Sequence, residues 1–356
     1  MARLESVCVR KSTEGSNPSL SAIYHPKSNK FYSMKAKSLN KKREIYVFPT
    51  SPFHFDGTFH KPSHFPARLD YWESGKYWQA IRINKQIFGL KIENKGDIQK
   101  PKIKISIFYD KSISDKEIED IRQEIIWRFD LNTDLNEFNK LAKSDKRFYP
   151  IFKQWLGMRN SSAHNLYELL IVSVLLQNAT IRRTVQMMNA LLDNYGVKLK
   201  FDGKEIFAIW LPEKLKNVSE QNLRDLKIGY RAKFIKRLSQ DFAEGKVDGR
   251  KLRMLDQENA KKELMKLYGV GPETTRILLF EVCHQYDAFD HIAPWQQKIY
   301  SRLFYNQPLV PANKIRDDIK KQYGMYSMLA VHYIWEDIFW RRENEKIDWL
   351  EKEIRL

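Results

Sequence analysis

The spacing of apolar residues changes once along this 356-residue chain, and that change constrains the fold more than any other feature. Before it, four segments rich in β-branched and aromatic residues alternate partially with a two-residue period, as strands do; they are residues 45–48, 77–83, 87–92 and 103–108. After Asp130, apolar residues recur at intervals of three and four, as in helices. We therefore predict an α+β fold, with an N-terminal antiparallel β-sheet domain at residues 44–129 and an all-helical body at residues 130–356.

One helix is expected inside the sheet domain, after the last strand. Ser114 can cap the start of a helix that runs to about Phe129, and Glu117 completes a capping-box pattern with it. The sheet domain is thus predicted to include one helix.

Charge is the second constraint. The chain has 62 Lys and Arg residues against 44 Asp and Glu, a formal net charge of +18. Residues 1–43 hold ten of the basic residues and two of the acidic ones, and few large apolar residues at a fixed spacing. We expect this segment to be a disordered basic tail and the partner of the whole chain to be a polyanion, with nucleic acid as the leading candidate.

Several classes of protein are excluded by composition. No stretch approaches the roughly 18 consecutive apolar residues that a membrane span needs, and no secretion signal follows the first basic residues, so we expect a cytoplasmic protein, located at the nucleoid. Cys8 and Cys283 are the two cysteines, too few for a four-thiolate zinc or iron-sulfur site. No spacing of His, Asp and Glu favours a metal site, and none is predicted.

A Gly-Val-Gly sequence, Gly269–Gly271, lies between two helical patterns within residues 262–282. Pro272 suits the first turn of the second helix. Glycines let a ligand approach the backbone closely, and the free amides at a helix N-terminus form an anion site suited to a DNA phosphate. Taken alone, the same pattern also fits a plain turn between two helices.

This segment resembles the helix-hairpin-helix of the DNA glycosylase superfamily (HhH-GPD), with the strongest likeness to the 3-methyladenine DNA glycosylase II and 8-oxoguanine glycosylase branches. The resemblance covers most of residues 44–343. Residues 52–135 resemble the N-terminal sheet domain of that family, and residues 152–159 and 175–180 resemble its segment that fills the gap left by an extruded base. Residues 332–335 resemble a closing helix that bears a pocket tryptophan.

The resemblance implies roles for particular residues. Asp290, nineteen residues after Gly271 in the loop 286–296, corresponds to the catalytic carboxylate, although an Asp there also suits a turn or a helix cap. The candidate walls of the base pocket are Trp335, Trp295, Phe289, Tyr286 and Tyr230, each equally compatible with a place in the core. The candidate DNA-binding residues are Gly269, Val270, Gly271, Thr274, Gln177, Asn178 and Arg182. Carbonyl groups of residues 266–271 are implied to hold a monovalent cation, and no other cofactor is expected.

Two departures from the family pattern affect the predicted chemistry. Members with lyase activity carry a lysine two residues after the last hairpin glycine, and this chain has Glu273 there, so no Schiff base can form at that position. If the chain is aligned on Pro294 instead, Gln296 takes the catalytic position and Asp290 does not.

Two functions are compatible with these residues. The first is a monofunctional DNA glycosylase, acting as a monomer on double-stranded DNA, that flips out a modified base and leaves an abasic site. The second is a catalytically inactive helix-hairpin-helix protein that only binds DNA. The excised base stays open among alkylated purines, oxidised guanine and the bulky cytosines of some phage genomes, so both base excision repair and antiviral defence are hypotheses. One possible coding of residues 15–20 resembles part of a serine tRNA gene, which makes Met34 an alternative start and favours defence.

Overall fold

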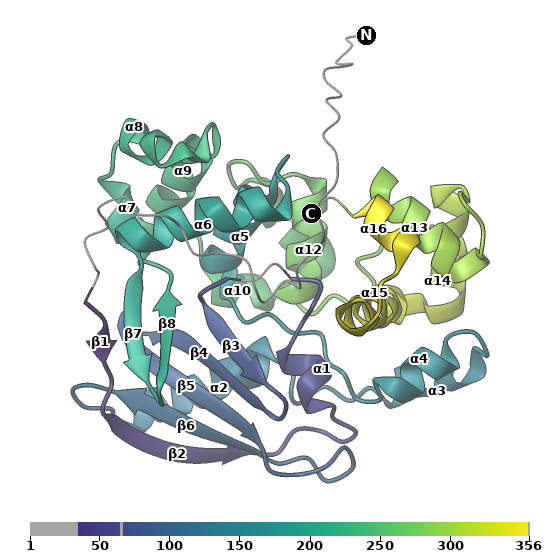
Figure 1. Cartoon of the computed structure of the whole chain (residues 1–356), viewed down its shortest axis with the longest axis horizontal. Coiled ribbons are helices and arrows are strands. Elements are labelled where there is room, and N and C mark those ends of the chain that lie inside the picture. The colour runs from purple at the N-terminus through teal and green to yellow at the C-terminus, as the bar shows by residue number, and fades with distance from the viewer. Residues whose placement is uncertain (1–34, 65–66, 355–356) are drawn as a thin grey trace. The chain divides into compact units, whose positions relative to one another are not determined.

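An antiparallel sheet of five strands, in the order β2-β6-β5-β4-β3, forms the base of the structure (Figure 1). The computed structural model describes residues 35–64 and 67–354. The strands of this sheet are β2 (Lys41–Val47), β3 (Asp70–Glu73), β4 (Lys76–Ile83), β5 (Gln86–Asn94) and β6 (Ile103–Tyr109). The four strands predicted from the sequence are confirmed. Strand β3 and the short helix α1 (Phe55–Phe59) were not anticipated.

The predicted helix with its capping box is also confirmed, as α2 (Asp115–Arg128). Ser114 Oγ accepts a hydrogen bond from the Glu117 amide at 3.2 Å, and Glu117 Oε2 accepts one from the Ser114 amide at 2.9 Å. Its buried residues Ile118, Ile121 and Ile125 pack in one core with the sheet. Each such side chain contributes about 1.5–3 kcal/mol by leaving water, so the amphipathic pattern of α2 fixes which of its faces meets the sheet.

The body after Asp130 is helical with one exception, which corrects the prediction of an all-helical body. Strands β7 (Val197–Phe201) and β8 (Lys204–Ala208) form a hairpin, and β1 (Lys37–Ser38) pairs with β7 in parallel. This small sheet shares a core with the large one, in which Trp78, Ile87 and Phe108 meet Phe201. The Asp202-Gly203 pair is a strong hairpin signal that the helical spacing of the surrounding residues obscured.

The sheet begins earlier than expected. Strand β1 lies at Lys37–Ser38 and β2 starts at Lys41, so the predicted tail of residues 1–43 ends too late. Pairing with β6 orders this basic stretch, because the backbone hydrogen bonds of a ladder do not depend on apolar side chains. The prediction for residues 1–34 lies outside the described residues.

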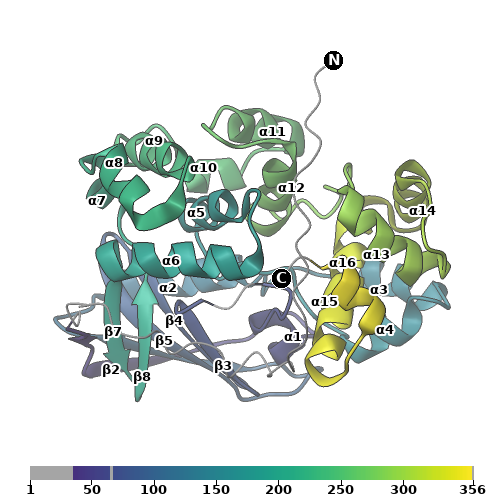
Figure 2. The same ribbon diagram turned by 45° about the horizontal axis from the view of Figure 1, so that its top comes forward.

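The helices form two groups (Figures 1 and 2). The first comprises α5 (Leu166–Leu176), α6 (Ile181–Tyr195), α7 (Pro212–Lys216), α8 (Glu220–Leu223), η2 (Arg224–Ile228), α9 (Arg231–Ala243), α10 (Gly249–Arg253), α11 (Gln257–Met265) and α12 (Pro272–Glu281). The second comprises α3 (Asn136–Ser144), α4 (Tyr149–Gln154), α13 (Pro294–Tyr305), α14 (Ala312–Tyr323), η3 (Gly324–Tyr326), α15 (Ser327–Asn344) and α16 (Asp348–Glu353). Among the described helices, none is both long and apolar enough to cross a membrane.

The second group joins two segments that are distant in sequence. Phe138 of α3 and Phe152 of α4 share a core with Ile315 of α14 and Tyr333 of α15. Phe280 of α12 belongs to the same core, so α12 is the helix at which the two groups meet. An N-terminal sheet followed by a helical body is the α+β class that the sequence predicted, and it is confirmed.

Arg159 anchors the crossing from the sheet domain to the helices. Its side chain is completely buried, and its guanidinium donates to the carbonyl oxygens of Thr133, Thr50 and Pro52 at 2.9, 2.5 and 3.0 Å. Residues 152–159 were expected to fill the space of an extruded base. That expectation is wrong for Phe152 and Arg159, because both side chains are buried in the protein.

Replacement of Arg159 by Met should lower the free energy of unfolding by about 3–5 kcal/mol, because buried carbonyl groups would lose a charged donor. Urea unfolding followed by circular dichroism measures this loss. Arg147→Met is the matched control, since the Arg147 guanidinium is exposed and makes one hydrogen bond, to Phe304 O at 3.2 Å. Equal stability of the two variants would contradict the anchoring role.

Candidate active site

The predicted helix-hairpin-helix is present, with α11 and α12 joined by residues 266–271. Gly269 has φ +84°, and a Cβ atom there would lie 2.9 Å from the ring of Phe234, so the hairpin itself requires glycine at this position. Gly271 has an ordinary φ of −105°, and a Cβ atom there would meet no atom within 4 Å. The turn therefore does not require glycine at 271. Because residue 271 has no side chain, a ligand can approach the backbone closely from the solvent.

Helix α12 starts directly behind this open position. Gly271 is its N-cap and Pro272 its first residue, and no side chain caps the helix. The first amides of a helix lack partners within it and carry the positive end of the helix dipole. This N-terminus can therefore accept an anion such as a phosphate.

Gln177, at the end of α5, holds the hairpin in place. The side-chain Nε2 donates to the Gly269 carbonyl at 2.9 Å. The main-chain carbonyl of Gln177 accepts from the Tyr230 hydroxyl at 3.3 Å and from the Arg231 guanidinium. Asn178 is exposed and its Nδ2 lies 3.4 Å from the Tyr230 oxygen. The structure thus brings the predicted residues Gln177 and Asn178 to the hairpin.

The other candidate DNA-binding residues lie on nearby elements. Val270 is buried in the hairpin, Thr274 is half-buried in the first turn of α12, and Arg182 is exposed in the first turn of α6. Tyr230, predicted as a wall of the base pocket, lies beside the hairpin instead and is 42% exposed. Their DNA contacts stay a prediction.

Several further basic residues lie around the hairpin, among them the buried Arg231. The Arg183 guanidinium donates to the Lys227 carbonyl, Arg231 lies over the ring of Tyr230 at 4.8 Å, and Lys233 lies over Tyr268 at 5.5 Å. These residues come from three separate elements, so no local pattern in the sequence marks them. A positive surface around a helix N-terminus is suited to a nucleic-acid backbone. We call residues 177–183, 227–233 and 266–274 the hairpin face.

Asp290 lies in the loop before α13, three residues ahead of its N-cap Ala293. Its carboxylate is half exposed and lies 3.1 Å from Lys261 Nζ of α11. It lines a pocket of about 110 Å³ together with Asp287 and Lys320. Most of the other lining groups are polar, so this pocket offers ion pairing but few apolar surfaces for a base.

Gln296, the alternative at the catalytic position, is buried at the start of α13. Its Oε1 accepts a hydrogen bond from the Ala293 amide at 3.2 Å, as the third residue of a helix often does. The Gln296 side chain therefore caps the start of α13. Among the described residues it has no hydrogen bond to Asp290, so the two candidates for the catalytic position are not joined in one site.

The predicted pocket aromatics fall into three places. Trp335 of α15 lies 5.5 Å from Trp295 of α13, measured between ring centroids, and 5.8 Å from Tyr300. Phe289 is buried against Tyr300 and belongs to the core. Trp295 is 39% exposed, so a ligand can reach this Trp295–Trp335 pair.

Tyr286 lies elsewhere, with its hydroxyl donating to Asp130. Its burial, together with the neighbouring Asp130 carboxylate, raises the pKa of Tyr286. The phenol therefore stays protonated and serves as a donor that ties the loop to the end of α2. Tyr230 lies in the third place, at the hairpin face. The five residues do not form one pocket in this structure.

Glu273 occupies the place where relatives with lyase activity carry a lysine. Its two carboxylate oxygens accept from Arg276 Nη2 at 2.6 Å and from Nε at 3.3 Å. The Arg276 side chain is buried and also lies 3.2 Å from Met328 Sδ of α15. This ion pair places a fixed negative charge, instead of an amine, in the first turn of α12.

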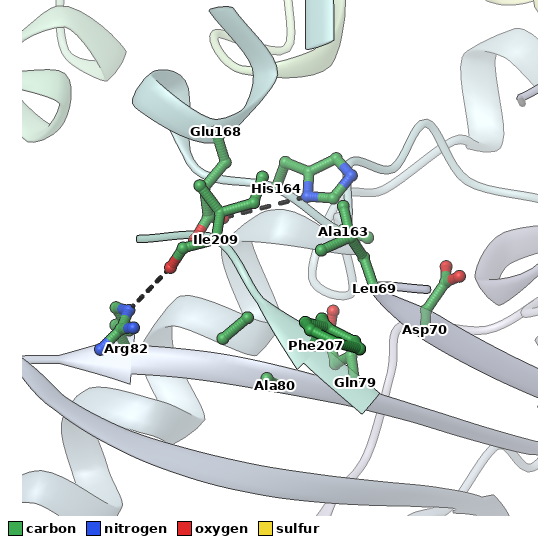
Figure 3. Close-up of a pocket in the computed structure, with 11 residues that line it drawn as sticks. Leu69, Asp70, Gln79, Ala80, Arg82, Ala163, His164, Glu168, Phe207 and Ile209 are labelled. Atoms are coloured by element: carbon green, nitrogen blue, oxygen red, sulfur yellow. Dashed lines mark hydrogen bonds and ion pairs between the residues drawn. The ribbon is translucent and has the colours of Figure 1, made fainter. Parts of the chain in front are cut away.

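A second cavity lies between the sheet and α5 (Figure 3). It is lined by Arg82, which donates to the Ile209 carbonyl at 3.1 Å, and by His164, which lies 3.9 Å from Glu168. Its volume is about 20 Å³, room for a single water molecule. It is too small for a nucleobase and contains none of the predicted site residues.

A family model described as "HhH-GPD superfamily base excision DNA repair protein" matches residues 171–354, slightly more than half of the chain. The chain belongs to the HhH-GPD superfamily. The match spans the hairpin, the Asp290 loop and α15, so the resemblance noted in the sequence is confirmed.

Two curated proteins are similar to the chain in sequence. DNA-3-methyladenine glycosylase of Bacillus subtilis is 26% identical over 164 residues, which are 44% of this chain and 54% of the relative. A probable N-glycosylase/DNA lyase of Methanothermobacter thermautotrophicus is 25% identical over 51% of this chain and 64% of the relative. The chain therefore matches less than two thirds of the length of these curated relatives.

The structural comparison concerns the fold. Clostridium acetobutylicum 8-oxoguanine glycosylase/lyase, solved with double-stranded DNA, has a TM-score of 0.62 over 86% of this chain and 99% of that chain, at 22% identity. At this identity the likeness shows a shared fold across nearly the whole of the Clostridium chain.

The hairpin carbonyls bear on the implied monovalent cation. The Gly269 carbonyl accepts from Gln177, and the Leu267 carbonyl accepts from the Val270 amide at 3.1 Å, which leaves each oxygen one lone pair. The arrangement is compatible with a cation, whose presence stays a prediction. Within residues 35–64 and 67–354, no group of three or more His, Cys, Asp or Glu is arranged to hold a metal ion.

Substitution of Gly271 by Val should weaken DNA binding at least about tenfold, to a similar extent for every DNA sequence, because the side chain would keep a phosphate from the amides of α12. The fold should persist, since the new side chain meets open space. Fluorescence anisotropy with several duplexes measures the binding. Gly269→Val is the contrasting variant, expected to unfold at lower temperature because of its clash with Phe234. Unchanged affinity of Gly271→Val would contradict the phosphate role.

Proposed function

We propose that this protein is a monofunctional DNA glycosylase: it binds double-stranded DNA as a monomer, extrudes a modified base and hydrolyses its N-glycosidic bond. The observation that carries the proposal is the open backbone at Gly271, in front of an uncapped helix and held by Gln177 within a basic surface. Membership of the HhH-GPD superfamily supports it, and so do the names of the relatives, which are glycosylases.

The chemistry needs a carboxylate near the sugar. Breaking an N-glycosidic bond builds positive charge on the sugar, which a carboxylate stabilises while it orients or deprotonates water. We assign this role to Asp290. Its carboxylate is half exposed on the loop that follows α12, and Lys261 is its partner at 3.1 Å. DNA phosphates can compete for Lys261, which would release the carboxylate for catalysis.

The absence of lyase activity is the second part of the proposal. A lyase reaction needs an amine that forms a Schiff base with C1′ of the sugar. Glu273 cannot supply one, and its bidentate pair with Arg276 commits both groups to each other. The nearby amine of Lys266 lies before the hairpin and pairs with Glu263 at 2.6 Å. Water is therefore the nucleophile, and the product is an intact strand with an abasic site.

A non-catalytic DNA-binding protein is the second candidate. It is favoured by one observation: the first turn of α13 carries the capping amide of Gln296 instead of an acid, while Asp290 is engaged with Lys261. Both candidates share the hairpin face. They differ in whether base release depends on Asp290. Base excision repair is the proposed process for the first candidate, with attack on modified phage DNA as a variant of the same reaction.

Asp290→Asn should reduce base release by about 100-fold or more while DNA binding changes little, because the neutral amide cannot stabilise a cationic sugar. Abasic sites formed in alkylated and oxidised DNA are counted with an aldehyde-reactive probe under single-turnover conditions. Asp287→Asn is the matched control from the same loop, since its carboxylate accepts a hydrogen bond from Gln257 at 2.9 Å. Full activity of Asp290→Asn, or no release by the unsubstituted protein, would contradict the assignment.

The product should be an intact strand. End-labelled DNA treated with the protein should show breaks only after hot alkali, because no positioned amine can open the sugar. Borohydride added during the reaction should trap no covalent protein-DNA adduct. Breaks without alkali, together with an adduct that disappears in Lys266→Ala, would show a lyase and refute this part of the proposal.

A further inference from the structure

A cluster of buried polar side chains lies where the sheet domain, α12 and α15 meet. It comprises Lys61 and Ser63, which follow α1, together with Glu281 at the end of α12 and His332 and Glu336 on α15. Glu336 is 1% exposed, and the Glu281 side chain is 17% exposed. The proposed catalytic step uses neither carboxyl group, so their burial needs another explanation.

The two carboxyl groups have oxygen atoms without donors. Glu336 Oε1 accepts from Ser63 Oγ at 2.5 Å, but its Oε2 is buried and has no hydrogen-bond partner among the described residues. Glu281 Oε2 is likewise buried and unpartnered. Each such atom costs about 1–3 kcal/mol, because it has left water without a replacement. Two such atoms in one cluster mark a place that an external donor can complete.

The donors within the cluster are already used. Lys61 Nζ donates to the carbonyls of Gly57 at 2.6 Å and Arg159 at 3.1 Å, and its third contact is His332 Nε2 at 3.1 Å. An ammonium group has three hydrogens, so Lys61 has none left for the carboxyl groups. His332 Nδ1 is 3.9 Å from Glu336 Oε1, and His64 Nε2 is 4.0 Å from Glu281 Oε1, both beyond hydrogen-bond distance.

Electrostatics agrees with this excess of acceptors. Burial, followed by the neighbouring Glu336, raises the pKa of Glu281 to about 8, and burial also raises the pKa of Glu336. Burial lowers the pKa of Lys61 to about 8. The carboxyl groups therefore compete for too little positive charge. A ligand that brings N–H donors relieves both groups.

Glu281 lies on α12, and His332 and Glu336 lie on α15. Glu281 ends the helix whose N-terminus forms the hairpin face, about 15 Å along the axis from Gly271. Glu336 follows Trp335 in α15. The helices contact each other on the way, through Arg276 and Met328 and through Phe280 and His332, whose rings lie 5.3 Å apart. The cluster therefore shares α12 with the hairpin face and α15 with Trp335.

We propose that Glu281 and Glu336 select bases that carry an exocyclic amino group, whose N–H groups the unpartnered oxygens accept. This rests on the base extrusion of the proposed function and names the class of base that the site takes. Derivatives of guanine, adenine or cytosine supply such donors. Hypoxanthine and uracil place a carbonyl oxygen where an amino group of adenine or cytosine would lie, and hypoxanthine lacks the 2-amino group of guanine. An unpartnered carboxyl oxygen accepts from an amino group but gains no hydrogen bond from a carbonyl oxygen in its place, so the deaminated bases bind more weakly.

The test is a binding experiment that does not depend on hydrolysis. Duplexes carry one 2′-fluoro-arabino nucleotide, which resists cleavage, opposite an abasic analogue, so that pairing with the other strand does not differ. Three matched pairs are compared by fluorescence anisotropy: guanine and hypoxanthine, adenine and hypoxanthine, cytosine and uracil. The unsubstituted protein should bind the amino member of at least one pair about tenfold more tightly.

Two variants and a control connect that preference to the cluster. Glu336→Gln and Glu281→Gln should each bring the ratio within a pair close to one, mainly by weakening binding of the amino member. Glu345→Gln, at the exposed C-cap of the same α15, should keep the ratio of the unsubstituted protein. Thermal unfolding of each variant identifies any that fails to fold, and the partly exposed Glu281 provides the second readout if Glu336→Gln does.

Two results would overturn the proposal. The first is equal affinity of the unsubstituted protein for both members of every pair. The second is equal weakening of both members by the Gln variants, because a purely structural role of the two carboxyl groups predicts that outcome. Base release from the matching 2′-deoxy duplexes is measured in parallel. Discrimination without any base release would refute the glycosylase assignment and leave the amino-group selection standing, so the two failures are distinguishable.

Discussion

The hydrogen bond from the Gln177 side chain to the Gly269 carbonyl is the contact on which the hairpin face depends. It joins the end of α5 to the turn between α11 and α12. The main-chain carbonyl of Gln177 accepts hydrogen bonds from Tyr230 and Arg231, at the start of α9. Three elements distant in sequence thereby converge on the N-terminus of one helix. A phosphate bound there would meet backbone amides that are fixed before it arrives, which limits the entropy lost on binding.

Helix α12 connects this surface to the rest of the chemistry. Its first turn carries the Glu273–Arg276 pair and its last residue, Glu281, reaches the buried cluster. Hydrophobic packing fixes the helix in between, since Phe280 lies in the core of the second helix group. Well-packed residues thus hold unsatisfied carboxyl groups at the junction of α12 and α15. Retention of costly polar groups on a rigid frame is typical of a binding site.

Much of this arrangement could be predicted from local patterns. The strands around Ile81, Leu90 and Ile105 and the capping box at Ser114 follow from spacing and side-chain chemistry that act within a few residues. The hairpin was visible for the same reason, because Gly-Val-Gly and Pro272 act locally. The β7–β8 hairpin was also local, but its Asp-Gly turn lies inside a region dominated by helical spacing.

The candidate site was only partly visible in the sequence, because its geometry depends on contacts between distant segments. Gln177 was marked by its place at the end of an apolar helix, whereas no spacing along the chain relates it to its partner Arg231. Tyr230 and Tyr286 were grouped with Trp335 by chemistry alone, and the fold separates them. The Glu281–Glu336 cluster was missed entirely, since no spacing along the chain relates residue 61 to residues 281 and 336.

The central claim is that this protein excises a base, and identification of the released product tests it most directly. The unsubstituted protein is incubated with alkylated DNA, oxidised DNA and phage DNA rich in modified cytosine, and the small-molecule fraction is analysed by mass spectrometry. The account predicts one class of free modified base, released in equal number to the abasic sites that appear in the DNA. Tight binding of all three DNAs with no free base from any of them would contradict it.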